Sequence, residues 1–184
     1  MSRPQTPNPN AERQTKNPKP FRMYHLLRYT TYNLWANDKI LSLIKSRMTN
    51  ELLDKEINSS FPSLRKTIYQ IWDAEYHWLR RLNGESLLDW PSKNFNGEFS
   101  LAIEKILSID KDFILYTENL SEEKASSPFT YKNIEGKTFT NPVWESVMHC
   151  MNHSTYHRGQ AVTMLRQLGV TEIPSTDFIS FCRI

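Results

Sequence analysis

The sequence has only two cysteines, only five glycines and no long run of apolar residues. Cys150 and Cys182 are too few for a disulfide scaffold, which indicates a reducing compartment. Because no stretch of about 18 consecutive apolar residues occurs, the sequence offers no candidate membrane-spanning helix. The first residues also lack the apolar segment of a secretory signal peptide. We therefore expect a cytoplasmic protein without membrane contact.

Charge of neither sign dominates the sequence. The chain has 23 basic and 20 acidic residues and a formal net charge of +3. The basic residues are scattered along the chain, whereas nucleic-acid-binding proteins gather them into a patch or stripe. Internal repeats and glycine-rich phosphate loops are also missing. These absences predict that nucleic acid is not a partner.

The composition divides the chain into a short arm and one domain. Residues 1–20 are rich in proline, asparagine and basic residues and show no apolar periodicity. Such a segment is predicted to be disordered or docked in an extended form. The remaining 164 residues, 21–184, are a suitable length for a single globular domain with one core.

Apolar residues recur at helical spacing in four segments of this domain. The segments are residues 21–47, a second that starts at Ser60-Phe61-Pro62 and ends before Asn83-Gly84, a third from Ser100 to about Ser121, and a fourth from Val143 to Leu168. Ser60, Ser100 and Asn141 are the residues expected to cap the second, third and fourth helices. Gly169 follows the last helix, as glycine often does.

The segment between the third and fourth helices has a different pattern. Residues 129–131 and 137–140 alternate in polarity around a turn that ends in Gly136, which predicts a small β-hairpin or an extended segment. The second and third connections are long enough to cross over the bundle. The predicted fold is therefore all-α, a four-helix bundle with a non-trivial order of connections.

Three histidines follow one another at four-residue steps on the predicted fourth helix. They are His149, His153 and His157. A four-residue step rises about 6 Å, so neighbouring members of the series can share one ion, whereas the first and third are about 12 Å apart. On a helical wheel His157 borders the apolar stripe, His153 lies one step further round and His149 two. His153 and His157 are therefore the pair expected to line a groove between helices.

Two further features suggest a site or close packing near this pair. Gly159 lies inside the helix, where glycine costs about 1 kcal/mol relative to alanine, so we expect another helix or a ligand close to it. Glu75 falls in the apolar stripe of the second helix, where an unpaired carboxylate would be costly. Its partner is predicted to be an arginine such as Arg28 or Arg158 in a buried ion pair, or alternatively a metal ion.

Several strings in the sequence resemble the signature segments of the DinB-like (DinB/YfiT) family. The strings are YNLWAN at residues 32–37, IWDAEYHWLR at 71–80, HCMNHSTYHRGQ at 149–160 and PSTDFI at 174–179. The resemblance covers residues 21 to 181. It implies a four-helix bundle in up-down-down-up order, usually a homodimer, with a divalent zinc or nickel ion held by three histidines. His153 and His157 match two of these ligands.

The sequence departs from the family pattern at the third ligand. The matching position, five residues before Glu75, is Gln70. An amide oxygen is a harder and weaker donor to zinc or nickel than imidazole, so the metal is expected to bind more weakly or to be absent. Gln70, Glu75 and water all stay open as the third donor.

The resemblance implies chemistry on a low-molecular-weight thiol. Family members are similar to metal-dependent transferases that activate such a thiol. The leading hypothesis is therefore a metal-dependent thiol S-transferase or a related detoxification enzyme. The alternative is a metal-depleted helical bundle that serves as a binding or stress-response protein without catalysis.

Overall fold

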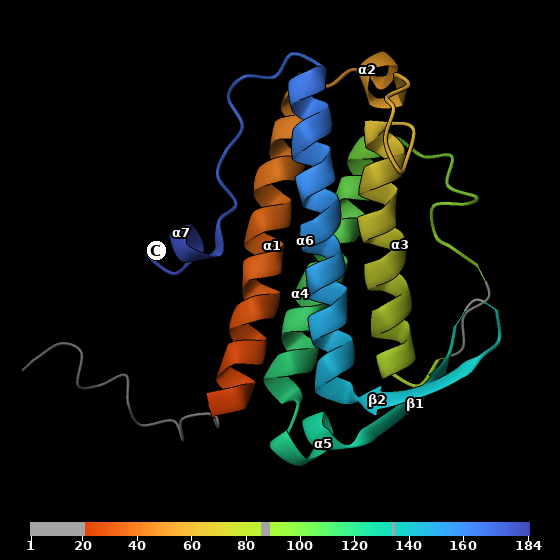
Figure 1. Cartoon of the computed structure of the whole chain (residues 1–184), viewed down its shortest axis with the longest axis vertical. Helices are drawn as coiled ribbons and strands as arrows, with labels where there is room; N and C mark the ends of the chain where they lie inside the picture. Colours follow the sequence, from red (N-terminus) through yellow and green to blue (C-terminus); the bar gives the residue numbers. More distant parts are fainter. Residues whose placement is uncertain (1–20, 86–88, 134) are drawn as a thin grey trace, which may run out of the picture.

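Four long helices form a bundle in the computed structural model, which describes residues 21–85, 89–133 and 135–184. They are α1 (Phe21–Arg47), α3 (Leu64–Leu82), α4 (Phe99–Asn119) and α6 (Val143–Gln167). Figure 1 shows α1 and α6 running one way and α3 and α4 the other. The predicted all-α bundle in up-down-down-up order is confirmed. The arm predicted for residues 1–20 lies outside the described residues.

Each long helix packs against two neighbours around one apolar core. α1 contacts α4 and α6, and α3 contacts the same two helices from the other side. The core contains fully buried side chains from all four helices, including Ile40, Ile44, Ile68, Ile106, Phe113, Met151 and Leu165. Burying one such side chain contributes about 1.5–3 kcal/mol, so this core supplies the main stabilisation of the bundle.

The predicted helix caps were wrong by one to three residues. α3 begins after Ser63, whose hydroxyl accepts from the backbone N–H of Lys66, and not at Ser60. Glu98 precedes α4 without a side-chain cap, so Ser100 lies inside the helix. Asn141 pairs with Phe129 in the hairpin, and its side chain donates to Glu145. Strand pairing keeps residue 142 extended, and α6 therefore starts at Val143.

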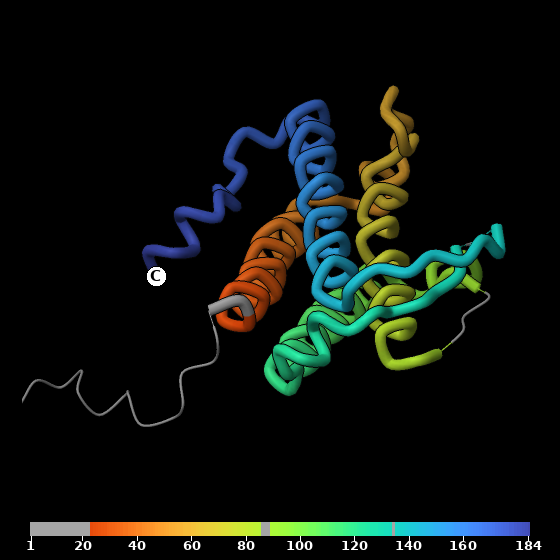
Figure 2. The backbone as a smooth tube through the Cα atoms, turned by 60° about the horizontal axis from the view of Figure 1, so that its bottom comes forward, coloured from red at the N-terminus to blue at the C-terminus, as the bar shows by residue number. Residues whose placement is uncertain are grey.

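The predicted hairpin is present between α5 (Glu122–Ser126) and α6. β1 (Pro128–Lys132) pairs in antiparallel register with β2 (Thr138–Pro142). Gly136 has φ of 80°, a left-handed conformation that suits glycine in the turn. The hairpin lies across one end of α3 and α6 (Figures 1 and 2), and the Tyr131 ring packs on Trp78 of α3 at 4.9 Å.

Within the described part of the chain, α5 and two further short helices lie outside the predicted set of four. α2 (Asn50–Asp54) occupies the polar stretch before α3, and α7 (Phe178–Phe181) follows the long C-terminal segment. α7 packs on α1, where Tyr32 donates its hydroxyl hydrogen to the carbonyl of Thr176 at 2.8 Å. Among the described residues, none of the helices combines the length and the apolar character that crossing a bilayer requires.

A layer of polar side chains crosses the middle of the apolar core and joins all four long helices. On α1, Asn33 and Asn37 accept hydrogen bonds from one nitrogen of Arg158 on α6. The amide nitrogens of both asparagines donate to Glu75 on α3 and to Asp110 on α4. The predicted burial of Glu75 is therefore correct, and the two carboxamides connect it to Arg158.

The charges in this layer do not balance unless one proton is added. Glu75 is fully buried, Asp110 is 1% exposed and Arg158 is 2% exposed. Burial raises the pKa of Asp110 well above its usual range, and the nearby charge of Glu75 raises it further. A proton on Asp110 leaves one carboxylate and one guanidinium in the layer, two opposite charges that the carboxamides of Asn33 and Asn37 bridge.

Replacing Arg158 by alanine should destabilise the fold strongly. The R158A variant leaves buried carboxyl and carboxamide groups without their cation, and a change of this kind costs about 3–5 kcal/mol. Urea unfolding followed by circular dichroism measures the loss. The matched control is R166A, because Arg166 lies on the same helix and is exposed; its effect should stay within about 0.5 kcal/mol. Equal, small losses in both variants would contradict the structural role of the layer.

Candidate metal centre

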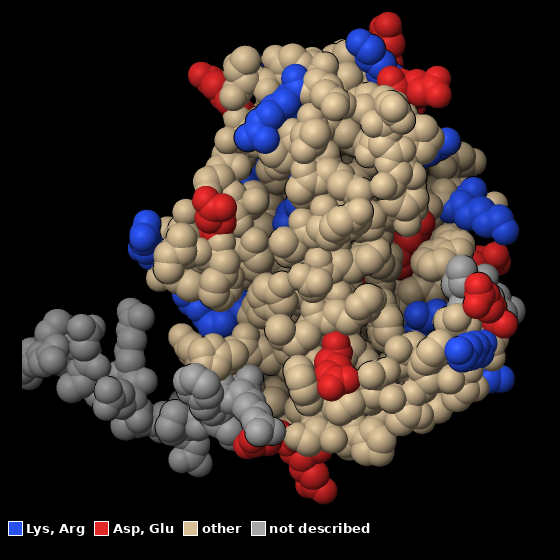
Figure 3. All heavy atoms as spheres, in the orientation of Figure 1, with Lys and Arg blue, Asp and Glu red and all other residues tan. Residues whose placement is uncertain are grey.

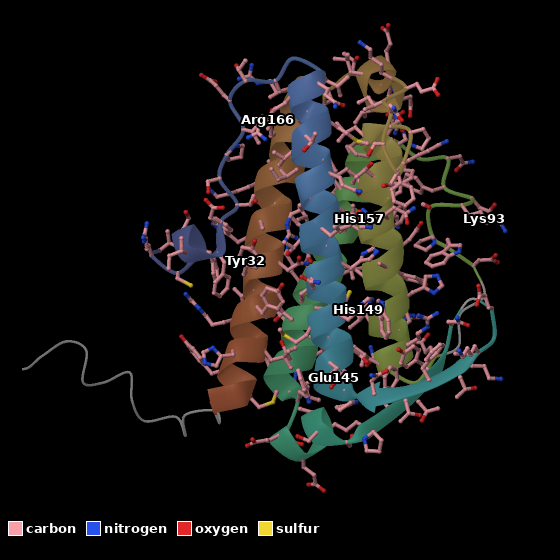
Figure 4. All side chains as sticks on the ribbon, in the orientation of Figure 1. Tyr32, Lys93, Glu145, His149, His157 and Arg166 are labelled. Carbon is pink, nitrogen blue, oxygen red and sulfur yellow. The ribbon has the colours of Figure 1, made fainter. Side chains whose placement is uncertain are left out.

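His153 and His157 lie one turn apart on α6, on the side of the helix that faces α3 and the segment before it. Figure 4 labels His157 and the neighbouring His149 on this side. The His157 ring meets Phe61 at 5.4 Å between centroids, and the His149 ring meets Trp78 of α3 at 5.1 Å. His157 is 4% exposed and His153 is half-buried. The pair therefore lies on the side of α6 that faces α3, which is the side that the helical wheel indicated.

The two imidazoles converge through the same ring nitrogen. The Nε2 atoms of His153 and His157 are 3.1 Å apart. Two zinc–nitrogen bonds of about 2.1 Å at a tetrahedral angle would hold their nitrogens about 3.4 Å apart. The observed separation is close to that value. This pair of residues fits two adjacent positions around one divalent ion.

Gln160 determines which nitrogen of His157 can bind an ion. Nδ1 of His157 lies 2.7 Å from Oε1 of Gln160, an acceptor, so Nδ1 carries the hydrogen. The lone pair is then on Nε2, the atom that faces His153. Gln160 in turn donates to the hydroxyl of Ser60 at 3.4 Å. A second partner of this kind is what orients most metal-binding histidines.

His153 is held in its neutral form. Burial, together with His157 and His149 nearby, lowers the pKa of His153 to about 4. Burial lowers the pKa of His157 as well, although its bond to Gln160 partly opposes this. Neutral imidazole is the form that binds a metal ion, so both rings have the required protonation state at neutral pH. Nδ1 of His153 is buried and has no hydrogen-bond partner among the residues that the structure describes.

The third donor predicted for the site is only partly explained by the structure. Glu75 is turned into the buried layer, where it also accepts from Ser154 at 2.6 Å. Within the described ranges, no three side chains of His, Cys, Asp or Glu come together as a metal-binding group. Gln70 is half-buried on α3, in the part of that helix bracketed by Thr67 and Glu75, which contact α6 at Met164 and Ser154. Gln70 and water therefore stay as the third donor.

The remaining histidines on these helices do not join the pair. The ring of His149 is 6.2 Å from that of His153 and is exposed, in agreement with its predicted peripheral position. The His77 ring packs at a tilt against Trp90, with centroids 4.2 Å apart, and its Nε2 atom lies 3.2 Å from the carbonyl oxygen of Asp89 in the segment after α3. Its role in the structure is packing.

The prediction that another part of the protein packs against Gly159 was wrong. A Cβ atom placed on Gly159 would meet no atom of the described residues within 4 Å. Gly159 is exposed, so no other part of the described chain approaches it closely.

The sequence analysis did not identify the residues that support the histidine pair, which are Gln160 and the asparagines of the buried layer. The sequence offered only weak indications of their roles. Gln160 follows His157 by three residues and so lies on the same face of the helix, and Asn33 and Asn37 are four residues apart among apolar residues.

Comparisons with known proteins agree with the fold and with the family resemblance. The family model described as the DinB family matches residues 22–183. Protein DinB of Bacillus subtilis (strain 168) is 28% identical over 154 residues, which cover 80% of this chain and 87% of that protein.

Two solved structures share the fold. A DinB-like protein from Bacillus cereus ATCC 10987 matches with a TM-score of 0.64 and 19% identity, over 83% of this chain and 95% of its own. A DinB-like protein from Bacillus subtilis matches with a TM-score of 0.55 and 15% identity, over 85% of this chain and 96% of its own.

His153 should stay neutral in the metal-free protein until the pH falls to about 4. The titration of each imidazole is measured by proton–carbon NMR after metal is removed with a chelator, and a His153→Gln variant assigns the signal. The pKa of His153 in the folded protein is below the value of about 6.5 expected in the unfolded chain. The contribution of this group to folding stability is therefore fully present above about pH 6.5 and is lost as the pH falls towards 4. A His153 midpoint above 6 would contradict the burial and crowding described here.

Proposed function

Because the chain belongs to the DinB family, we propose that it is a metal-dependent enzyme, a thiol S-transferase or an enzyme of a related detoxification reaction. His153 and His157 are the proposed ligands of a divalent zinc or nickel ion. The observation that carries the proposal is the 3.1 Å separation of their Nε2 atoms. A bound divalent ion with an open position lowers the pKa of a thiol or a water molecule that contacts it.

The thiol in this reaction comes from the substrate. Cys150 is completely buried, and burial raises the pKa of its thiol well above the usual range, so it stays protonated. Cys182 is exposed near the C-terminus and is unpaired in the structure. A low-molecular-weight thiol that reaches the histidine pair has no competing thiolate from Cys150. This supports an external thiol as the nucleophile.

The chain's own residues supply position and environment. Gln160 holds the hydrogen of His157 at Nδ1 and so leaves Nε2 available. Phe61 and Tyr156 both lie against the His157 ring, with centroids 5.4 and 5.1 Å away. These aromatic rings reduce the access of water to one side of the ligand. A partly dry site strengthens the interaction between a charged ion and its neutral ligands.

One observation favours a second candidate function. The site offers two imidazoles, and Gln70 stands where the family has a third. If the amide of Gln70 binds too weakly, the bundle holds no metal, and the protein is a non-catalytic binding or stress-response protein.

We also propose that the protein is a cytoplasmic homodimer that does not bind nucleic acid. The absence of nucleic acid as a partner is supported by the face in Figure 3, where basic and acidic side chains are mixed without a basic stripe.

Metal content distinguishes the two candidates. Untagged protein purified without added metal is expected to contain zinc, nickel, iron or manganese, measured by elemental analysis; less than about a tenth of an equivalent removes the basis of the enzymatic proposal. Q70H should raise metal occupancy and the melting temperature in the presence of metal, because it restores a third imidazole. Q167H is the matched control, since Gln167 is exposed on α6.

Activity is then tested on the metal-loaded protein. A low-molecular-weight thiol is mixed with a chromogenic electrophile, and the loss of free thiol is followed. H157A should abolish both the metal content and the turnover. Turnover that persists in H157A protein without metal would contradict the proposed site.

A further inference from the structure

A hollow of about 320 Å³ lies next to the metal centre, beyond His157 towards the C-terminal end of α6. It is bounded by α6 on one side and by the segment before α3 on the other. Six of its lining residues are Asn58, Ser59, Tyr156, Gly159, Gln160 and Thr163. Its volume is at the lower limit of ligand pockets, which suits one part of a small molecule.

Gly159 keeps this hollow open. Glycine inside a helix costs about 1 kcal/mol relative to alanine, and two ordinary reasons for accepting that cost are missing here. Gly159 is not among the glycines with positive φ, and nothing in the described part of the chain lies within 4 Å of the position its Cβ would take. A side chain at this position would extend into the hollow. The missing side chain of Gly159 therefore leaves the hollow open and does not make room for a neighbouring helix.

The lining determines the chemistry that the hollow accepts. Its polar groups are carboxamides and hydroxyls, and none of its lining residues carries a charge. A charged group here would find no opposite charge among the lining residues. Carboxamides and hydroxyls both donate and accept hydrogen bonds, as does an amide. The matching ligand group is therefore uncharged and has both donors and acceptors.

Two residues connect the hollow to the metal centre. Gln160 lines the hollow and also accepts from Nδ1 of His157 at 2.7 Å. Tyr156 lines the hollow as well, and its ring meets the His157 ring at 5.1 Å. The hollow thus adjoins, through Gln160, the Nδ1 atom of the same imidazole whose Nε2 atom faces His153. A ligand of modest length could contact both the hollow and the histidine pair.

We propose that this hollow is a binding subsite for an uncharged carboxamide or peptide-like part of the substrate. The subsite positions that part while the reacting end lies at the histidine pair, and only this last clause rests on the proposed function. Leucine at position 159 would fill the space that such a group needs. The subsite itself requires no metal.

The test uses the full-length, metal-free protein labelled with nitrogen-15. N-acetylglycinamide is titrated as the uncharged probe, and the backbone amide signals of Gly159, Gln160 and Thr163 are followed by NMR. We expect saturable shifts confined to the hollow. N-acetylglycine, which replaces the amide by a carboxylate, should bind about tenfold more weakly.

Two variants complete the experiment. G159L should weaken binding of N-acetylglycinamide about tenfold, because an added side chain occupies the hollow and would have to be displaced. N152L is the matched control, since Asn152 is exposed on the same helix and does not line the hollow; it should bind like the wild type. G159A checks folding, because alanine should raise the melting temperature where nothing is crowded.

Three results would overturn the proposal: no localised shifts with N-acetylglycinamide, unchanged affinity in G159L, or equal affinity for the carboxylate probe. Because the protein in this test is metal-free, such a failure leaves the metal proposal standing. Conversely, absence of metal in the purified protein leaves the subsite standing.

Discussion

The buried layer of two carboxyl groups, two asparagines and one arginine is the constraint on which the rest of the structure depends. Arg158 donates to the oxygens of Asn33 and Asn37, and the nitrogens of these asparagines donate to the two carboxyl groups. A carboxamide can accept from a cation through its oxygen and donate to an anion through its nitrogen at once. Since an unpaired buried charge is costly, the four helices must meet in an arrangement that keeps these carboxyl groups bonded to the asparagines and the asparagines bonded to Arg158.

This layer also decides where the histidines face. Ser154 and Arg158 point into the layer, and each directly follows one of the paired histidines, His153 and His157. Neighbouring residues on a helix are about 100° apart, so holding Ser154 and Arg158 in the core turns the histidines towards α3. Rotating α6 to hide or expose the imidazoles would break the buried bonds. The orientation of the two histidines is therefore a consequence of the core. Gln160 in addition determines that Nε2 of His157 carries the free lone pair.

The sequence predicted the long helices well because each carries an apolar stripe of many residues, and errors at single positions do not shift the stripe. Helix starts were less predictable, since a serine caps a helix only where the backbone before it is extended. Ser63 met that condition, whereas Ser60 and Ser100 did not. The short helix α2 depends on contacts with α3 that no local pattern reveals.

The site was predictable to the extent that its residues share one helix. His153 and His157 were found from spacing and the apolar stripe alone, and Glu75 from its position among apolar residues. Asn33, Asn37 and Asp110 were missed because a polar residue on a helix is usually exposed, and only long-range contacts make these three buried. The surroundings of Gly159 were predicted wrongly. A glycine inside a helix is compatible both with a closely packed neighbour and with an empty space, and the sequence does not distinguish the two.

The most direct test of the account is X-ray absorption spectroscopy of the zinc-loaded protein. If the buried layer holds the two histidines towards one ion, the spectrum should show two imidazole nitrogens at about 2.0–2.1 Å, completed by oxygen donors and without sulfur. A zinc environment with one imidazole or none, or with a sulfur ligand at about 2.3 Å, would contradict it.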